Sequence, residues 1–340
     1  MKILIDGNKK FYKACLHTHT ICSDGLMTPQ EVKNQYLARG YSAVAFTDHE
    51  ILYDHSDLTD ENFVAINGYE LATNNDRSPD PLLRHQSAHF NFIAKDPKNL
   101  TQIAYNRDYD WCHTDAQRDE AETRSVMLGY ERGHNLADFN MLTALANDNG
   151  FLVVYNHPAW SLHTALDWSG LRGLFAVETY NAGSVYGGYS ETRAAYDDLL
   201  TELCREAKAE GKTPAPLRTV FADDMHEFMF DDAGYVMIQA DRLTYPGLIS
   251  ALEKGEFYSS TRPEFRDLRI NGNVLIGKTS PVKSVCVIGP ARNKIRINGN
   301  IESFEIPLKG GFNDYFRVEI TDENGYVATT NAFYGALDEK

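Results

Sequence analysis

The stretch FYKACLHTHTICSDG, residues 11 to 25, joins an apolar run to two histidines and an aspartate. His17 and His19 are two residues apart, so their side chains point to the same side of a strand. Asp24 follows five residues later. Because neutral imidazole and carboxylate groups are common metal ligands, this stretch predicts a metal site at the end of the first strand.

Six further apolar or β-branched runs follow along the chain, and helical patterns separate several of them. Runs of this kind are typical of buried strands in a parallel sheet. They are YSAVAFTDH (41–49), NFVAINGYEL (62–71), SAHFNFIA (87–94), GFLVVYNHP (150–158), GLFAVETYN (173–181) and LRTVFADDMH (217–226). The clearest helical patterns lie between Thr28 and Gly40, at 141–150 and at 191–211. The alternation predicts an α/β protein with seven strands.

Histidines and carboxylates recur at the ends of these runs. In a parallel barrel all strand carboxyl ends open on one face, so residues far apart in sequence meet there. His89 differs, because it lies at the start of its run. The candidate metal ligands are His17, His19, Asp24, His49, Glu70, His89, His157, Asp224 and His226.

Nine ligands exceed what one ion takes, so we expect two or three divalent ions, Zn, Mn or Fe, bridged by Glu70. Asp48 points to the side opposite His49, so it is expected to orient a ligand. The other histidines and one nearby cysteine are interpreted as packing or surface residues. These are His55, His85, His113, His134, His163 and Cys22.

Two segments break the alternation. Residues 95–135 are polar and charged, with Tyr105, Tyr109 and Trp111, and an insertion of this length predicts an active-site cover or a mobile excursion. After residue 262, short strands alternate with turns such as NGN and DENG. We therefore expect a barrel domain over 1–262 and a small antiparallel β domain over 263–340.

Bulk properties limit the function classes. A formal charge of −15 over 340 residues argues against binding of long nucleic acids, which requires clustered Lys and Arg. The sequence contains no run of eighteen apolar residues, so it does not predict a membrane-spanning helix. The five cysteines are dispersed without a C-x-x-C pair, which favours reduced thiols. With no signal-peptide pattern at the start, we expect a cytoplasmic protein.

The ordered motifs H-x-H-x(4)-D-G, T-D-H, a glutamate after the third strand, N-H-P and D-x-H resemble the PHP (polymerase and histidinol phosphatase) superfamily of metal-dependent phosphoesterases. The resemblance covers roughly residues 11–262. It implies a distorted seven-stranded α/β barrel with a trinuclear metal centre. The stretch VEITDENGYVATTNAFY (318–334) is similar to the small β domain that ends some members.

Carried over to this chain, the resemblance assigns each candidate ligand to an ion. The first ion would bind His17, His19, Glu70 and Asp224; the second Glu70, His89 and His157; the third Asp24, His49 and His226.

Two positions depart from the family pattern. Asp223 stands where members often have Ser, so either Asp223 or Asp224 is the ligand. Arg262 stands where members often have Gly. If Arg262 faces the site it would bind a phosphate bidentately; otherwise it is a surface residue at a domain junction.

The leading hypothesis is a metal-dependent phosphoesterase that cleaves a small phosphate mono- or diester, for instance a nucleotide, by attack of a metal-bound hydroxide. The catalytic candidates are Asp48 and His226 for proton transfer and Arg262 for the phosphate. One alternative is a metal-dependent amide, carbamate or carboxylic ester hydrolase, because the same nucleophile serves these substrates. The other is a non-catalytic, metal-dependent binding module.

Overall fold

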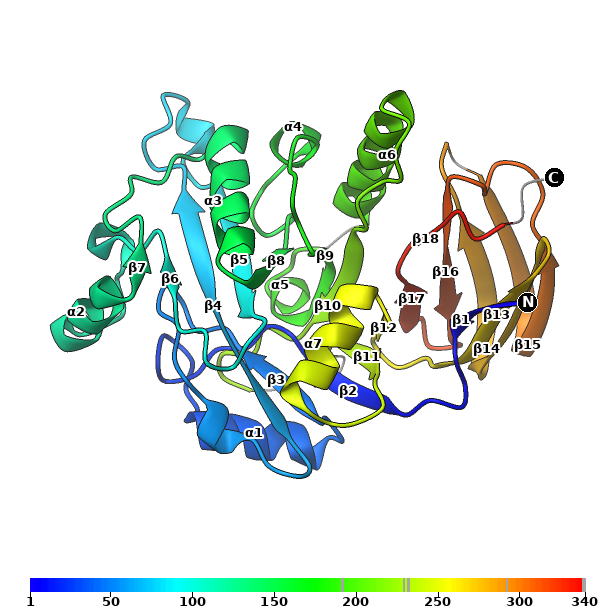
Figure 1. Cartoon of the computed structure of the whole chain (residues 1–340), viewed down its shortest axis with the longest axis horizontal. Coiled ribbons are helices and arrows are strands. Elements are labelled where there is room, and N and C mark those ends of the chain that lie inside the picture. The colour runs from blue at the N-terminus through cyan, green and yellow to red at the C-terminus, as the bar shows by residue number, and fades with distance from the viewer. Residues whose placement is uncertain (191–192, 229, 231–232, 292, 338–340) are drawn as a thin grey trace.

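Each of the seven predicted runs forms a strand in the computed structural model, which describes residues 1–190, 193–228, 230, 233–291 and 293–337. The strands neighbour one another in chain order (Figure 1). They are β2 (Phe11–Cys15), β3 (Ala43–Phe46), β4 (Val64–Asn74), β5 (Ser87–Ala94), β8 (Phe151–Tyr155), β9 (Ala176–Asn181) and β10 (Arg218–Ala222). The prediction of a mixed α/β protein is confirmed.

One strand runs opposite to the prediction. The pairs β2–β3, β3–β4, β8–β9 and β9–β10 are parallel, but β5 is antiparallel to both β4 and β8. The prediction of a parallel strand over 87–94 is therefore wrong. Between β4 and β5 the described chain forms only the short helix η2 (Pro81–Leu83), whereas a parallel pair requires a long crossover, usually with a helix. The reversal brings the start of β5, and with it His89, towards the carboxyl ends of its antiparallel neighbours β4 and β8.

The chain after β2 meets the chain after β10. Thr18 and Met225 form a parallel bridge. Asp224 N donates to His17 O at 3.1 Å, and His19 N donates to Met225 O at 2.9 Å. The two ends of the seven-strand series therefore lie side by side at the site. On the edge of β2 that faces away from β3, β2 pairs with the antiparallel strand β11 (Tyr235–Gln239).

The predicted helices are present. In α1 (Pro29–Ala38) the Thr28 side chain accepts from Glu31 N, and Glu31 accepts from Thr28 N, a complete capping box. The pattern at 141–150 belongs to α3 (Leu136–Asp148), and that at 191–211 to α6 (Ala194–Ala209); residues 191 and 192 lie outside the described residues. The remaining helices of the described chain are α2 (Asp115–Thr123), α4 (Ala165–Trp168), α5 (Ala182–Tyr186) and α7 (Tyr245–Lys254).

Apolar side chains fill both faces of this part of the sheet. One cluster joins Phe90 and Phe92 of β5 to Phe139 and Leu142 of α3. Another gathers apolar residues from all seven strands, including Val64 of β4 and Val154 of β8. Burial of these side chains holds the strand ends in fixed positions, which a multi-residue site requires.

The segment 95–135 is anchored rather than extended into solvent. It contains β6 (Gln102–Ile103), η3 (Arg107–Tyr109), α2 and β7 (Ser125–Val126). Arg132 Nη2 lies 2.7 Å from Glu50 Oε2, and both side chains are buried. This ion pair ties the end of the insertion to the chain between β3 and β4.

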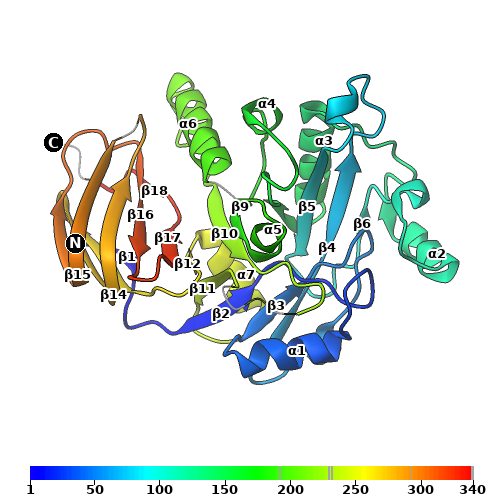
Figure 2. The same ribbon diagram turned by 180° about the vertical axis from the view of Figure 1, so that it is seen from behind.

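The C-terminal part of the sheet is antiparallel, as predicted. It follows β12 (Phe257–Ser260) and comprises β13 (Phe265–Asn271), β14 (Val274–Ile288), β15 (Lys294–Pro307), β16 (Tyr315–Thr321), β17 (Val327–Thr330) and β18 (Phe333–Tyr334). The N-terminal strand β1 (Lys2–Ile5) pairs with β13 at the edge of this part of the sheet (Figure 2). Buried Arg317 of β16 contacts Asp197 of α6 at 2.9 Å, which joins this part to the helices.

No helix within the described residues is long and apolar enough to cross a bilayer.

Candidate metal centre

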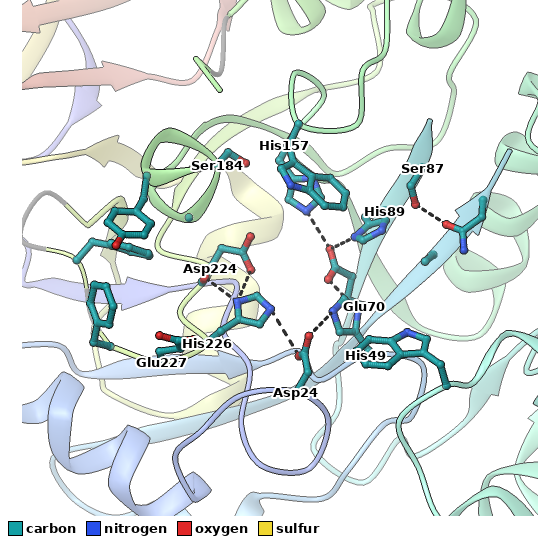
Figure 3. Close-up of a pocket in the computed structure, with 18 residues that line it drawn as sticks. Asp24, His49, Glu70, Ser87, His89, His157, Ser184, Asp224, His226 and Glu227 are labelled. Atoms are coloured by element: carbon teal, nitrogen blue, oxygen red, sulfur yellow. Dashed lines mark hydrogen bonds and ion pairs between the residues drawn. The ribbon is translucent and has the colours of Figure 1, made fainter. Parts of the chain in front are cut away.

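The nine predicted ligands converge at one end of the strands. Figure 3 shows seven of them, all except His17 and His19. His17 and His19 extend from β2 with their Nε2 atoms 3.2 Å apart. Asp224 Oδ1 lies 3.2 Å from each of these nitrogens. Glu70 approaches both rings at 3.4 Å. Four donors from three distant parts of the chain thus surround one point.

Glu70 of β4 also contacts a second set of rings. Its Oε1 lies 3.0 Å from His89 Nδ1 and 3.2 Å from His157 Nε2, and its Oε2 lies 3.2 Å from His49 Nδ1. The carboxylate is 1% exposed. The position of Glu70 between these groups is the one expected for a bridging ligand.

Asp24 organises the third group, at the mouth of the pocket. Its two oxygens lie 3.6 Å from His49 Nε2 and 3.5 Å from His226 Nε2, and His19 Nδ1 lies 3.6 Å from Oδ1. The rings of His19 and His226 stack with centroids 4.1 Å apart. Because both nitrogens of His19 face carboxylates, this ring connects the first group to the third.

Local backbone geometry aims two of these side chains. Asp224 has φ 55° and His157 has φ 20°, values that L-residues adopt at a cost and that concentrate at functional sites. Gly25 follows Asp24 in the D-G motif. A Cβ at Gly25 would lie 2.7 Å from the His19 carbonyl carbon. Only glycine therefore lets the Asp24 loop pack against the strand that carries the ligand.

Asp48 orients the same loop. It accepts hydrogen bonds from Thr20 N at 2.8 Å, from Thr20 Oγ1 and from Ser23 Oγ at 2.8 Å. Thr20 Oγ1 also donates to its Oδ2 at 2.9 Å, so both oxygens contact the segment that links His19 to Asp24. Asp48 therefore fixes the backbone between two candidate ligands.

Sequence reasoning missed Glu178, which is buried in β9. Its Oε1 lies 2.7 Å from His17 Nδ1, and its Oε2 accepts from His157 N at 3.0 Å and from Asn181 Nδ2 at 2.9 Å. A carboxylate behind a ligand imidazole fixes the ring and raises its basicity. Its one signal in the sequence is an acidic residue inside the apolar run GLFAVETYN.

Two asparagines were also missed. Asn156 Nδ2 donates to Glu70 Oε1 at 2.7 Å, and Asn181 Nδ2 donates to Asp224 Oδ2 at 3.1 Å. Each amide holds a carboxylate of the cluster in place. Because asparagine is common in turns after strands, neither residue is distinctive in the sequence.

The carboxylates favour positive charge at the first group. Burial by itself would lower the pKa of His17, but Asp224, Glu178 and Glu70 hold that pKa well above its ordinary value. Burial would likewise raise the pKa of Glu70, yet His89 and His17 hold it well below its ordinary value. A divalent cation would satisfy the same field.

Two further imidazoles respond in opposite directions. Burial, with His226 and His49 nearby, lowers the pKa of His19 to about 4. Burial opposes protonation of His157 as well, but its hydrogen bond to Glu70 raises the pKa to about 9. Neutral His19 carries the lone pairs that a metal ligand needs.

The donor set fits divalent metal ions. Ligands about 2.0 to 2.2 Å from a tetrahedral ion lie about 3.3 to 3.6 Å from one another, close to the 3.2 to 3.6 Å between nitrogen and oxygen atoms in the first and third groups. His19 Nδ1 is among the buried side-chain atoms of the described residues that have no hydrogen-bond partner. Such atoms are costly unless something binds them.

The structure separates the two adjacent aspartates. Asp224 faces the histidines, whereas Asp223 accepts from Tyr36 OH at 2.8 Å. Burial raises the pKa of Asp223 to about 7. Asp224 is therefore the member of the pair with ligand geometry.

Arg262 is not brought to the cluster. It is exposed, its guanidinium lies 3.9 Å over the ring of Tyr326, and it lines a separate cavity with Lys13 and Tyr41. This is the placement of a surface residue at a domain junction, the alternative considered for Arg262 in the sequence. The geometry gives no support to a phosphate-binding role. The reason is packing against the C-terminal strands, which the motif alone does not encode.

The remaining histidines do not join the nine. His55 and Cys22 form a small group with Asp48. His134 and His163 pair through their Nε2 atoms at 3.1 Å. His113 Nδ1 lies 2.7 Å from Asp110 Oδ1, and His85 is exposed. His55, His113 and His163 are buried, so they support the structure rather than cover its surface.

The sequence matches no protein-family model and no curated protein. The structure matches a two-domain protein from Bacteroides vulgatus that contains a predicted PHP-like metal-dependent phosphoesterase, over 98% of each chain, with 14% identity and a TM-score of 0.43. Over 63% of this chain, the structure is similar to a proposed metal-dependent phosphoesterase from Bifidobacterium adolescentis, with 87% of that chain covered, 17% identity and a TM-score of 0.33. Over the same share it is similar to an amidohydrolase from Chromobacterium violaceum, with 87% of that chain covered, 16% identity and a TM-score of 0.35. At these scores the function rests on the site itself.

Proposed function

We propose that this chain is a metal-dependent hydrolase of the PHP type that cleaves a small phosphate mono- or diester. One observation carries the proposal. Six histidines and three carboxylates, from the ends of strands spread over more than two hundred residues, gather with the spacing of metal ligands. We propose further that the seven strands close into a distorted barrel through the contact of residues 17–19 with 224–226. We also propose that 1–262 and 263–340 are separate domains, with β1 pairing across that boundary.

The proposed ligand groups follow the three sets of contacts. The first comprises His17, His19, Glu70 and Asp224; the second Glu70, His89 and His157; the third Asp24, His49 and His226. Zn, Mn or Fe in such groups activates water as a nucleophile and stabilises charge on a phosphoryl oxygen.

The protein's own groups would orient the reaction. Water forms a bond to phosphorus and loses a proton, while the bond from phosphorus to the alcohol oxygen breaks and that oxygen gains a proton. Of the three catalytic candidates, only His226 lines the pocket, so we assign the proton transfer to it. Where His226 binds an ion instead, the alcohol oxygen takes its proton from solvent. Asp48 and Glu178 act as positioning residues.

Elemental analysis and activity of one preparation test the proposal. We expect two or three divalent ions per chain, together with release of phosphate from monoesters or of a monoester from diesters. Glu70→Ala should abolish both metal binding and hydrolysis, whereas exposed Glu61→Ala should change neither. A metal-replete chain that hydrolyses no phosphate mono- or diester would contradict the proposal. A metal content near zero after repletion would contradict the ligand assignment as well.

One observation favours a second candidate, cleavage of an amide, carbamate or carboxylic ester. The described residues that line the pocket include no Lys or Arg, although phosphate sites commonly use such groups. The same preparation assayed with amide and carboxylic ester substrates separates the two functions.

A further inference from the structure

The pocket over the cluster is large enough for a whole small molecule. It has a volume of about 550 Å³, within the range of roughly 300 to 1,000 Å³ that ligand pockets occupy. Seven of the nine cluster residues line it, and Figure 3 labels all seven. A substrate bound at the cluster must therefore place the rest of its structure against the remaining walls.

Those walls are aromatic on two sides. On one side, Trp160 has its ring 5.0 Å from that of His89, and Trp111 has its ring 5.8 Å from that of His49. Trp111 comes from the 95–135 insertion and is 65% exposed. The two indoles therefore offer flat apolar surface beside the polar cluster, and a ligand that covers it would bury apolar area.

The opposite wall is a cluster of three rings. Tyr186 of α5 lies 5.7 Å from Phe228 and 5.3 Å from Phe230, and Phe228 and Phe230 are 5.2 Å apart. Tyr186 is 72% exposed. Flat, rigid faces on both sides of a cavity bind flat rings by stacking and exclude water.

The charges of the walls exclude a second anion. Beyond the cluster, the charged residue among the described lining residues is Glu227, and none is a Lys or Arg. Arginines on adjoining elements are held by carboxylates: Arg132 by Glu50 at 2.7 Å and Arg193 by Glu319 at 3.0 Å. The faces of aromatic rings also repel anions, because their quadrupole is negative there.

From these walls we propose that the substrate carries a single phosphoryl group, joined to a part that contains a flat ring and no second phosphate. This inference rests on the proposed function and specifies its substrate class. Hydrolysis breaks the bond from phosphorus to the ring-bearing alcohol and releases that alcohol and phosphate, or, from a diester, a monoester.

The test compares 2-phenylethyl phosphate with ethyl phosphate, whose alcohols have similar acidity, using the metal-replete full chain. We expect kcat/KM to be at least about tenfold higher for the aromatic ester, as stacking on one or two rings provides. The double variant Trp111→Ala/Tyr186→Ala should remove most of that preference, because kcat/KM for 2-phenylethyl phosphate should fall at least about fivefold more than kcat/KM for ethyl phosphate. Leu82→Ala, exposed and outside the pocket, should behave as wild type.

A second comparison tests the charge argument. A nucleoside monophosphate should be cleaved at least about tenfold more efficiently than the corresponding bisphosphate, and Glu227→Lys should narrow that ratio. Equal rates for the two alkyl esters, or an equal loss on both in the double variant, would overturn the aromatic part. A bisphosphate preferred by the wild type would overturn the charge part. If no phosphate ester is cleaved, the proposed function fails and this inference fails with it.

Discussion

Replacing Glu178 by glutamine tests whether a residue behind the cluster controls metal binding. The carboxylate accepts from His17 Nδ1, His157 N and Asn181 Nδ2 at 2.7 to 3.0 Å. Glutamine has the same shape but only one acceptor oxygen. If that oxygen faces His17, the amide NH₂ faces two other donors; if it faces those donors, the NH₂ faces His17.

The expected loss follows from these contacts. Hydrogen bonds to a charged group contribute about 1.5 to 3 kcal/mol each, and Glu178 is 1% exposed, so solvent screens little of this. Part of this free-energy loss destabilises the metal-free and metal-bound states equally and does not change metal affinity. The rest weakens metal binding, because His17 becomes less basic and less well oriented. Removing a carboxylate behind a ligand imidazole typically lowers metal affinity 10- to 100-fold. We expect Glu178→Gln to weaken metal binding by that factor, about 1.4 to 2.7 kcal/mol.

The assay is competition with a chromogenic chelator. Circular dichroism of the metal-free variant shows whether it is folded, and exposed Glu61→Gln is the matched control. Metal affinity within twofold of wild type in a folded Glu178→Gln variant would refute the reasoning. It would mean that the contact with His17 belongs to the metal-free state alone.

Three further changes have defined outcomes. Asp223→Asn should stabilise the chain at pH 8. The pKa of Asp223 in the folded state is about 7, above its ordinary 3.8, so the folded state binds more protons than the unfolded state between these pH values. The free energy of unfolding therefore falls as pH rises, by up to about 4 kcal/mol. Urea unfolding of the variant and wild type at pH 4 and pH 8 measures this, and an equal effect of the substitution at both pH values would contradict the prediction. Arg132→Met leaves buried Glu50 unpaired and should cost about 3 to 5 kcal/mol in the same assay; a cost below 1 kcal/mol would mean that the pair is solvated. Gly25→Ala should reduce metal content because its Cβ meets backbone at 2.7 Å, whereas Gly310→Ala has open space and should not; unchanged metal content in both variants would contradict the packing argument.

The convergence of candidate ligands at strand ends was predictable because position along a strand fixes side-chain direction. His17 and His19 share a side by the two-residue period, and the convergence of strand ends brings Glu70 and Asp224 to them. The direction of β5 was not predictable from SAHFNFIA, because a buried apolar run reads the same in either direction. The sequence therefore identified His89 as a candidate ligand but did not explain how the start of a strand could reach the other ligands.

Other features depend on contacts that no local pattern encodes. Glu178 lies inside an apolar run rather than at its end, so only its charge distinguishes it. Arg262 stacks on Tyr326, and that contact exists only once strands from the C-terminal part are in place. The choice between Asp223 and Asp224 likewise depends on Tyr36, a helix residue nearly two hundred positions away.

The pairing of β1 with β13 has a consequence for how the chain folds during synthesis. Lys2 pairs with Ile270, so an early strand of the nascent chain waits for a partner that leaves the ribosome far later. At roughly 5 to 20 residues per second, that delay is on the order of 15 to 50 s. During this time β1 is an unpaired edge, open to pairing with other chains or to chaperones. Shortening the delay by moving Lys2–Ile5 to the C-terminus, as a circular permutant, should leave the metal cluster intact and reduce aggregation during expression.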